Sequence, residues 1–463
     1  MSITDSGIGI RAAAGYVPRY RLTGEEINRS HNQKGGRGAR SLAGPDEDAL
    51  TLAVEAARRL PPGALDGVTR VLFCSTTPPY LVKNNASTAA AVLGLGDDVL
   101  AVDAGGSLRS AVGALLGAVP GTLVLAADVN TSRPGSPREL THGDAGAAVV
   151  VGAPDDAAAV ITTAASRTDE IQDQWRDPGQ RWVSQSEDRF PVSRYLSLLA
   201  DTVADGSGAS GGPFATADRV VVSAPSARVT SAAEQQLSDR GKITRPVETG
   251  YAGSADLLLR LCGALAESAA GQTVLAACLT DGCDVMLARA GETAGTAIAA
   301  GGGGEVFVPT YLRALTWRGL LDREPPRRPE PRPVSAPAAL RGAAWKYKLL
   351  ASECAACHFV STPPQQVCLR CGSTEHAPAI DMSRQPATIR TFSVDRLAYS
   401  LNPPMVAAVI GFERGGRLEV EITDSDPAAL RVGAPVRMIF RHRNSSGGIH
   451  NYVWKAVLEQ GAS

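Results

Sequence analysis

Four cysteines carry the clearest chemical signal in this sequence. Cys354 and Cys357 form one Cys-x-x-Cys pair, Cys368 and Cys371 form a second, and ten residues separate the pairs. Two such pairs complete the closed set of four thiolates that structural zinc prefers; four unligated thiols are the alternative. A closed site leaves no open coordination position, so we expect it to stabilise the fold, with His358 outside the ligand set.

A second segment has the strand–turn–helix pattern that often carries a catalytic nucleophile, but it lacks the nucleophile. Residues 101–118, AVDAGGSLRSAVGALLGA, combine a strand end, a turn of small residues and an apolar helix. Backbone N–H groups at a helix N-terminus can stabilise an oxyanion. Gly106 and Ser107 occupy the turn, and no cysteine is present. The segment therefore offers backbone donors without a thiol.

The elements that must position these residues differ along the chain. Residues 1–320 alternate apolar runs with Ala-rich stretches in which apolar residues recur every three or four positions, and no internal repeat is visible. This alternation predicts a layered α/β domain with buried strands. Asp46 or Asp48 is the expected N-cap of the helix within DEDALTLAVEAARRL. The expected strands are RVLFCST, VLAVDA, GTLVLAADV, GAAVVVG, RVVVSA and TVLAACLTDG.

The last third of the chain has another character. Residues 321–342 are rich in Pro and Arg, which predicts an extended linker without a regular helix. We expect a zinc ribbon over residues 343–380. Residues 381–463 contain β-rich runs separated by turns and predict a small all-β OB-fold barrel of five strands.

Bulk composition excludes several classes of protein. Of the 463 residues, 44% are hydrophobic and 20% charged, and the net charge is −1, as in a soluble globular protein. A near-neutral chain with 5% aromatics argues against nucleic acid as a partner. We see neither a signal peptide nor a membrane span, so the expected location is cytoplasmic.

Several ordered motifs between Gly7 and Gly319 resemble archaeal-type hydroxymethylglutaryl-CoA synthases of the thiolase superfamily. They are GIRAAAGYVPRYRLTGEEINR, GPDEDALTLAVEAARR, STTPPYLVKNNAS, DQWRD, THGDAGAAVVVG and TYLRALTWRG. The C-terminal part resembles the zinc ribbon and OB-fold protein that partners thiolase-like enzymes, here fused to the same chain.

The resemblance implies a five-layered αβαβα fold of two related halves. It also implies a homodimer and an acyl thioester of coenzyme A or of an acyl carrier protein as the ligand. The family uses a cysteine, a glutamate and a histidine with a neighbouring asparagine. In this chain the corresponding positions are Gly106, Thr76, Ser223 and Ser226, and only Arg228 keeps the charge of a lysine that resembles a CoA contact. Covalent acyl transfer therefore lacks its nucleophile and base.

Other polar residues near these motifs are candidates for the missing roles. His142 and Asp144 flank Gly143, and a histidine beside a carboxylate is a workable general base, although His142 could be an exposed loop residue and Asp144 a turn residue. Asp103 and Tyr80 lie beside the vacated positions, and both have structural alternatives. The last candidates follow later apolar runs: Tyr251, and Asp281 and Cys283 on the last loop.

The sequence thus favours an enzyme that makes or breaks a C–C bond beside an acyl thioester, as an aldolase, a retro-aldolase or a condensing enzyme without an acyl-cysteine. Gly106, Ser107 and Arg228 are expected to hold the thioester. The catalytic candidates are His142, Asp144, Asp103, Tyr80, Ser223 and Tyr251. The alternatives are a C-acyltransferase that works by direct transfer and a non-catalytic scaffold that binds an acyl carrier or a partner synthase.

Overall fold

The described chain divides into two units. The structure is a computed structural model that describes residues 7–32, 38–187, 189–205, 212, 214–245, 249–302, 306–321, 323–324 and 335–459. Unit 1 contains the chain up to Ala43 together with Asp48–Ala90 and Leu95–Tyr311, and unit 2 contains Gly44–Glu47, Ala91–Gly94 and the chain from Leu312. Among the described residues, no helix combines the length and the hydropathy needed to cross a membrane.

Unit 1 repeats one strand arrangement twice. In each half the third and fourth strands lie parallel on either side of the second strand, and the fifth and first strands follow, each antiparallel to the strand before it. The strand orders β5-β4-β6-β7-β1 and β12-β11-β13-β14-β8 are therefore equivalent, and β1 pairs with β8. The strands are β1 (Ile8–Tyr16), β4 (Arg70–Cys74), β5 (Leu100–Asp103), β6 (Thr122–Asp128), β7 (Ala145–Gly152), β8 (Ala159–Thr168), β11 (Arg219–Ser223), β12 (Lys242–Ile243), β13 (Thr273–Cys278) and β14 (Gly282–Ala290).

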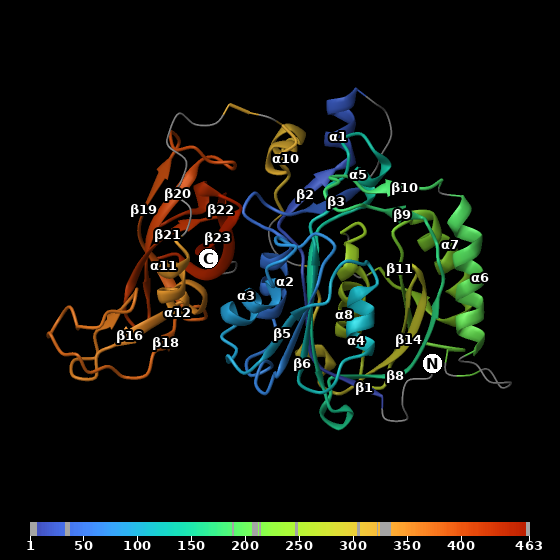
Figure 1. The fold of residues 1–463 in the computed structure, drawn as a ribbon, viewed down its shortest axis with the longest axis horizontal. Helices are drawn as coiled ribbons and strands as arrows, with labels where there is room; N and C mark the ends of the chain where they lie inside the picture. Colours follow the sequence, from blue (N-terminus) through green and yellow to red (C-terminus); the bar gives the residue numbers. More distant parts are fainter. Residues whose placement is uncertain are drawn as a thin grey trace. The chain divides into compact units, whose positions relative to one another are not determined.

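Helices complete the expected five layers. Helices α4 (Ser110–Leu116) and α8 (Asp256–Ala266) form the central layer, and their apolar residues share one core with strands of both halves. One outer layer holds α2 (Ala49–Arg58) and α3 (Asn85–Val92), and the other holds α6 (Phe190–Asp205) and α7 (Ala227–Leu237) (Figure 1). Asp48 is the N-cap of α2 and closes a capping box with Thr51, one of the two caps that the sequence predicts.

Strand β5 corrects the expectation of a buried strand at residues 99–104. It forms an edge of the sheet and pairs with β4 alone. Leu100 is 55% exposed and Val102 is 37% exposed. Because an edge strand has one neighbour instead of two, its apolar residues stay accessible in the single chain.

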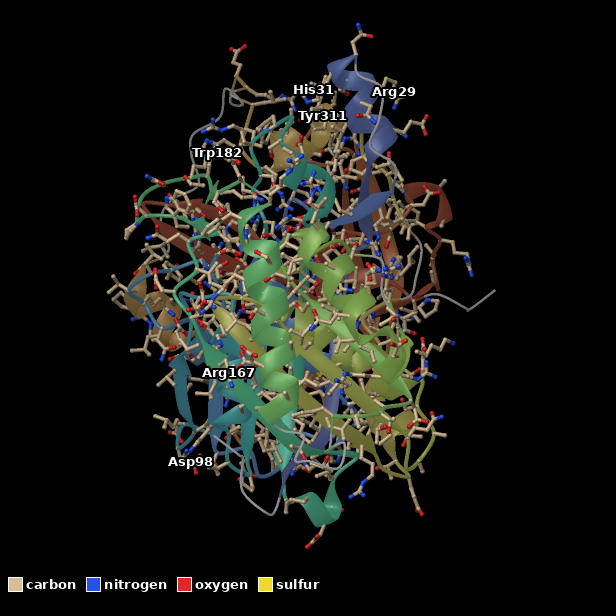
Figure 2. The ribbon with its side chains drawn as sticks, turned by 90° about the vertical axis from the view of Figure 1, so that its right-hand side faces the viewer. Arg29, His31, Asp98, Arg167, Trp182 and Tyr311 are labelled. Carbon is tan, nitrogen blue, oxygen red and sulfur yellow. The ribbon has the colours of Figure 1, made fainter. Side chains whose placement is uncertain are left out.

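Shorter elements surround the end of unit 1 from which α1 (Gly24–His31) extends. The Tyr311 hydroxyl lies 3.0 Å from His31 Nε2 and donates to Glu139 Oε1 at 2.9 Å (Figure 2). This network ties α1 and the start of α10 (Tyr311–Trp317) to α5 (Pro137–Thr141). The other short elements of this unit are β2 (Tyr20–Thr23), β3 (Ala39–Leu42), β9 (Gln174–Trp175), β10 (Ser184–Gln185), β15 (Ile298–Ala299) and α9 (Ala294–Ala297).

Unit 2 contains α10 apart from its first residue, two further helices, a three-stranded ribbon and a barrel. Helix α11 (Ala336–Arg341) shows that the prediction of a linker without helix is wrong for its last residues, while residues 325–334 lie outside the described part. Pro337 is tolerated because N–H groups in the first turn of a helix have no intrahelical partner. The ribbon has the strand order β17-β16-β18. These elements are α12 (Ala343–Lys348), β16 (Leu350–Glu353), β17 (Val360–Ser361) and β18 (Ile380–Asp381).

The barrel closes in the order β19-β20-β21-β23-β22, which confirms the predicted five strands. Phe440 stacks on Tyr452, and the neighbouring Arg441 is buried on the opposite face of β22, where its Nη2 donates to Asp424 Oδ2 at 2.9 Å. The Trp454 indole donates to the Tyr347 carbonyl and so attaches α12 to the barrel. The strands are β19 (Ala387–Asp395), β20 (Met405–Phe412), β21 (Arg417–Ile422), β22 (Pro435–Ser446) and β23 (Ile449–Leu458).

Candidate functional site

The turn at the vacated nucleophile position has its own backbone partners. Gly106 is exposed at φ 98°, and its N–H donates to the Ser75 carbonyl at 3.1 Å. The Ser107 N–H donates to Ser110 Oγ at 3.2 Å. Both amides thus have partners within the protein, and their role in holding a thioester stays a prediction. A Cβ on Gly106 would meet open space, but a φ of 98° is strained for any L residue, so the turn suits glycine.

No thiol of unit 1 can replace the missing nucleophile. Cys74, Cys262, Cys278 and Cys283 are all buried. Burial raises the pKa of each of these thiols to about 12. Since the thiolate is the reactive form, these cysteines are inert near neutral pH.

A buried carboxylate holds the walls around this turn. Asp128, at the end of β6, accepts hydrogen bonds at Oδ1 from the N–H of Thr76 at 2.7 Å and from the Ser75 hydroxyl at 3.0 Å. The N–H and the hydroxyl of Thr77 donate to the same oxygen. The Ser254 N–H, just before α8, donates to Oδ2 at 2.7 Å. Asp128 thus joins the loop after β4 to the start of α8.

His142 and Tyr251 come together as neighbours in space. Their rings meet edge to face with centroids 5.3 Å apart, and the Gly143 N–H donates to the Tyr251 carbonyl. His142 is 2% exposed, its Nδ1 lies 3.0 Å from Thr141 Oγ1, and its Nε2 is buried without a partner among the described residues. Burial and the charges of Arg138 and Arg40 hold the pKa of His142 well below its usual range. The imidazole is therefore neutral and weakly basic, unlike the general base that the sequence suggests.

Asp144 does not orient His142. Its Oδ2 accepts from the Ala43 N–H at 2.6 Å and its Oδ1 from the Asn130 N–H at 2.7 Å. Both oxygens are thus engaged by backbone donors in a fully buried position. The predicted histidine–carboxylate pair does not form, and Asp144 holds loops together instead.

Asp103 and Tyr80 also meet structural partners. The Asp103 carboxylate accepts from the N–H groups of Asn85 and Ala86 and so caps α3. The Asn85 amide nitrogen donates to Asp103 Oδ2 and to the Tyr80 carbonyl, both at 2.8 Å. Asp103 and Tyr80 therefore lie close together, because the Asn85 side chain donates hydrogen bonds to both residues.

Ser223 and Arg228 lie apart from this group. Ser223 is buried at the end of β11, where its carbonyl accepts from the Leu279 N–H. Arg228 is exposed in the first turn of α7. Ser226, at the position of the family's asparagine, caps the same helix through a hydrogen bond from the Val229 N–H.

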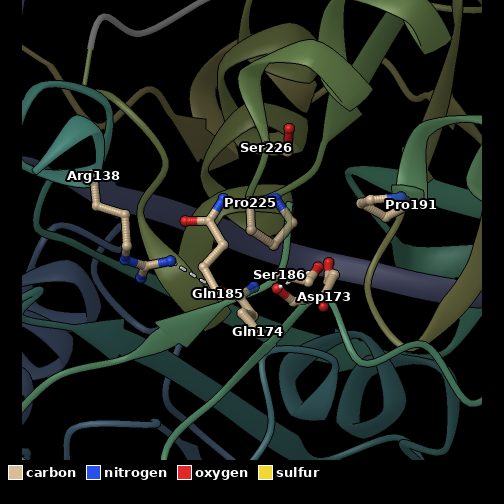
Figure 3. Close-up of a pocket in the computed structure, with 8 residues that line it drawn as sticks. All are labelled: Arg138, Asp173, Gln174, Gln185, Ser186, Pro191, Pro225 and Ser226. Carbon is tan, nitrogen blue, oxygen red and sulfur yellow. Dashed lines mark hydrogen bonds between the residues drawn. The ribbon is translucent and has the colours of Figure 1, made fainter. Parts of the chain in front are cut away.

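Sequence reasoning missed a pocket whose acidic residue is Asp173. Asp173 is 8% exposed, and its Oδ2 accepts from the fully buried Tyr195 hydroxyl at 3.0 Å. Burial raises the pKa of Asp173, the Tyr195 hydrogen bond opposes this, and nearby Asp281 raises it further. The pocket holds about 10 Å³ of free space, room for about one water molecule. Its lining comprises Arg138, Asp173, Gln174, Gln185, Ser186, Pro191, Pro225 and Ser226 (Figure 3).

A bidentate ion pair fixes the loop between β13 and β14. Arg109 Nε and Nη2 donate to the two oxygens of Asp284 at 2.6 and 2.7 Å, and Nη1 donates to the Asp281 carbonyl at 3.0 Å. Burial raises the pKa of Asp281, while Arg109 and a hydrogen bond with Ser107 lower it. The vacated turn and the last loop are thus joined by charge and hydrogen bonds rather than by a catalytic thiol.

The four cysteines of the ribbon come together as their spacing predicts. Their sulfur atoms all lie within 4.8 Å of one another, with Cys354 and Cys371 3.5 Å apart and Cys357 and Cys368 3.6 Å apart. Tetrahedral zinc with bonds of about 2.3 Å places its sulfurs about 3.8 Å apart, so the donor set suits that ion. His358 Nδ1 lies 3.1 Å from Glu353 Oε1.

The burial of His142 predicts a dependence of stability on pH. Because its pKa is lowered in the native state, only the unfolded chain gains this proton as pH falls below about 6.5. The free energy of unfolding then falls with decreasing pH, by up to about 1.4 kcal/mol per pH unit, because the folded state keeps His142 neutral. Denaturant unfolding between pH 7.5 and 5 should show this loss, and His142→Asn should flatten it. His31→Asn is the matched control, and an equal slope for His142→Asn and the wild type would refute the expectation.

Comparisons with known proteins agree with this architecture. A family model described as "ChsH2, C-terminal OB-fold domain" matches residues 379–441. The hydroxymethylglutaryl-CoA synthase of Archaeoglobus fulgidus is 31% identical over 195 residues, which are 38% of this chain and 56% of that protein. The synthase of Aeropyrum pernix is 32% identical over 192 residues, 37% of this chain and 52% of that protein. The chain therefore spans about half the length of the curated relatives it matches.

Solved structures show the same fold. A crystal structure of HMG-CoA synthase complexed with CoA aligns with a TM-score of 0.54 and 17% identity over 67% of this chain and 87% of that chain. The curacin pathway HMG synthase in complex with acetyl donor-ACP aligns with a TM-score of 0.52 and 16% identity over 62% of this chain and 81% of that chain. The chain is thus similar in sequence to archaeal hydroxymethylglutaryl-CoA synthases, with a thiolase-like fold joined to an OB-fold domain.

Proposed function

We propose that this protein makes or breaks a C–C bond beside an acyl thioester without forming a covalent acyl-enzyme. The observation that carries the proposal is Gly106, a glycine at φ 98° in the position where the resemblance places the nucleophile. The four buried thiols of unit 1 cannot substitute for it. Condensing chemistry on acyl thioesters is the chemistry of the proteins that the chain resembles.

Asp173 is the proposed general acid and base of this reaction, in place of His142. A carboxyl whose pKa is raised by burial, as that of Asp173 is, can both accept and release a proton. In the condensing direction the Asp173 carboxylate takes the proton from the carbon next to the thioester, and the enolate attacks a carbonyl carbon. The protonated Asp173 then returns the proton to the resulting alkoxide, so that the proton balance closes. Tyr195 holds the carboxyl in place throughout.

The thioester carrier is coenzyme A or an acyl carrier protein. Similar structures were solved with CoA in one case and with an acetyl donor-ACP in another. Arg228 is exposed and able to meet a phosphate of either carrier. The working unit is a homodimer, for which the exposed edge strand β5 offers a surface with unpaired backbone groups.

Replacing Asp173 tests the assignment. Asp173→Asn should lower kcat by about 100-fold or more, since general acid–base catalysis contributes roughly 10²–10⁴. The melting temperature at pH 7 should be unchanged or higher, because burial disfavours the ionised Asp173 that the variant removes. The wild-type rate should decline on the acid side at a higher pH than for an ordinary carboxylate. Turnover of acyl-CoA and thermal unfolding are the measurements.

Asp177→Asn is the matched control, because Asp177 belongs to the same DQWRD motif and is exposed. Full activity of Asp173→Asn would contradict the assigned role.

A second function, that of a non-catalytic scaffold for an acyl carrier, is favoured by the small free volume of the pocket. It predicts binding of the carrier without turnover in the wild type and in both variants.

The four cysteines are proposed to hold one structural zinc ion, which supplies folding energy to the ribbon rather than chemistry. Protein from zinc-supplemented cells should contain about one zinc per chain by elemental analysis. Cys371→Ser should lower that content and expose the ribbon to trypsin near Arg370. Cys283→Ser, outside the ribbon, should retain the metal. Zinc content unaffected by Cys371→Ser would contradict the proposed ligand set.

A further inference from the structure

Arg138 is a cation of unit 1 without an acidic partner. It is half-buried, and its Nη1 donates to Gln174 Oε1 at 2.7 Å. Within the described part of the chain it forms no other hydrogen bond and no ion pair. Two other half-buried arginines of the unit are paired with carboxylates: Arg109 with Asp284 and Arg260 with Asp256. Removing a guanidinium from water without a counter-charge is costly, so an anion at Arg138 would offset that cost.

The remaining donors of Arg138 border the pocket described above. Figure 3 shows its guanidinium directed toward Gln174 and Gln185. The acidic residue of the lining is Asp173, whose carboxyl is already shared with Tyr195. The neutral His142 and the buried Tyr251 are close enough for the charge of Arg138 to affect their pKa values. The pocket therefore has the positive charge of Arg138 and the carboxyl of Asp173 in its lining, with polar and apolar residues between them.

The backbone that carries Arg138 is held firmly. The neighbouring Glu139 is 2% exposed, and its carboxylate accepts from the Gly135 N–H at 2.8 Å and from the Tyr311 hydroxyl. The Glu139 carbonyl accepts from Arg40 Nε. Helix α5 is thus held in place, and the hydrogen bond to Gln174 Oε1 orients the Arg138 guanidinium, whose planar fork suits a planar anion.

From these observations, and resting on the proposed function, we propose that the acyl thioester substrate carries a second, free carboxylate that Arg138 binds. The planar fork of arginine matches a carboxylate through two parallel hydrogen bonds. A short dicarboxylic acyl group such as malonyl or succinyl carries such a carboxylate. Arg138 is then a residue that determines specificity, while Asp173 performs the proton transfers.

Calorimetric binding of matched thioesters tests this inference. Succinyl-CoA and butyryl-CoA differ only in a terminal carboxylate against a methyl group, and malonyl-CoA and propionyl-CoA form a second pair. The wild type should bind the acidic member of each pair about tenfold or more tightly, as expected for hydrogen bonds to a charged group. Arg138→Gln should abolish this preference without weakening the neutral ligands. Arg138→Lys should keep part of it, and Arg133→Gln, an exposed arginine close in sequence, should keep all of it.

Equal affinities of the wild type for both members of each pair would overturn the inference and leave the proposed function standing. If Arg138→Gln weakened the binding of both members of a pair equally, the inference would also be overturned. Arg138 would then be assigned to binding the part of the molecule that all these thioesters share. Absence of any acyl-CoA binding would refute the inference, and failure to bind carrier-linked acyl groups as well would refute the proposed function. If Arg138→Gln does not fold, the preference of the wild type and its reduction in Arg138→Lys still decide the matter.

Discussion

The buried carboxylate of Asp128 is the constraint on which the site depends. Five donors from the loop after β4 and from the start of α8 meet its two oxygens, and no water reaches it. Each of those donors would be costly to bury unpaired, so the two segments are held in one arrangement. Gly253 permits the contact, since a Cβ there would collide with the Asp128 side chain. The Ser75 carbonyl in turn accepts a hydrogen bond from the Gly106 N–H, so the same loop also holds the turn at Gly106.

The two halves of unit 1 meet at this point. Each half ends its parallel strands near the start of a central helix, and each central helix is preceded by a glycine with positive φ, Gly106 in one half and Gly253 in the other. The family resemblance of the sequence motifs implies a nucleophile at the first of these starts, where this chain has Gly106. In this chain the Arg109–Asp284 ion pair bridges the two halves. The acid–base group that we propose, Asp173, directly precedes β9, which pairs with β10.

Local patterns predicted the layers, the cysteine cluster and the barrel, because alternating apolar residues and Cys-x-x-Cys spacing are properties of short segments. The candidate site was harder to predict. The neutral state of His142 depends on Arg138 and Arg40 as well as on burial, and the role of Asp144 depends on the Ala43 N–H, which is 101 residues away. The DQWRD motif was visible, but the environment of Asp173 depends on Tyr195 in another helix. Long-range contacts of this kind leave no trace in the spacing of residues.

The absence of a covalent intermediate is the central claim, and the mass of the intact protein during turnover tests it most directly. The wild type would be mixed with its acyl-CoA substrate, quenched in acid at intervals and measured by mass spectrometry while product accumulates. The account predicts an unmodified chain at every time point. A chain heavier by one acyl group, with the adduct mapped to Ser107 or Cys283, would contradict it.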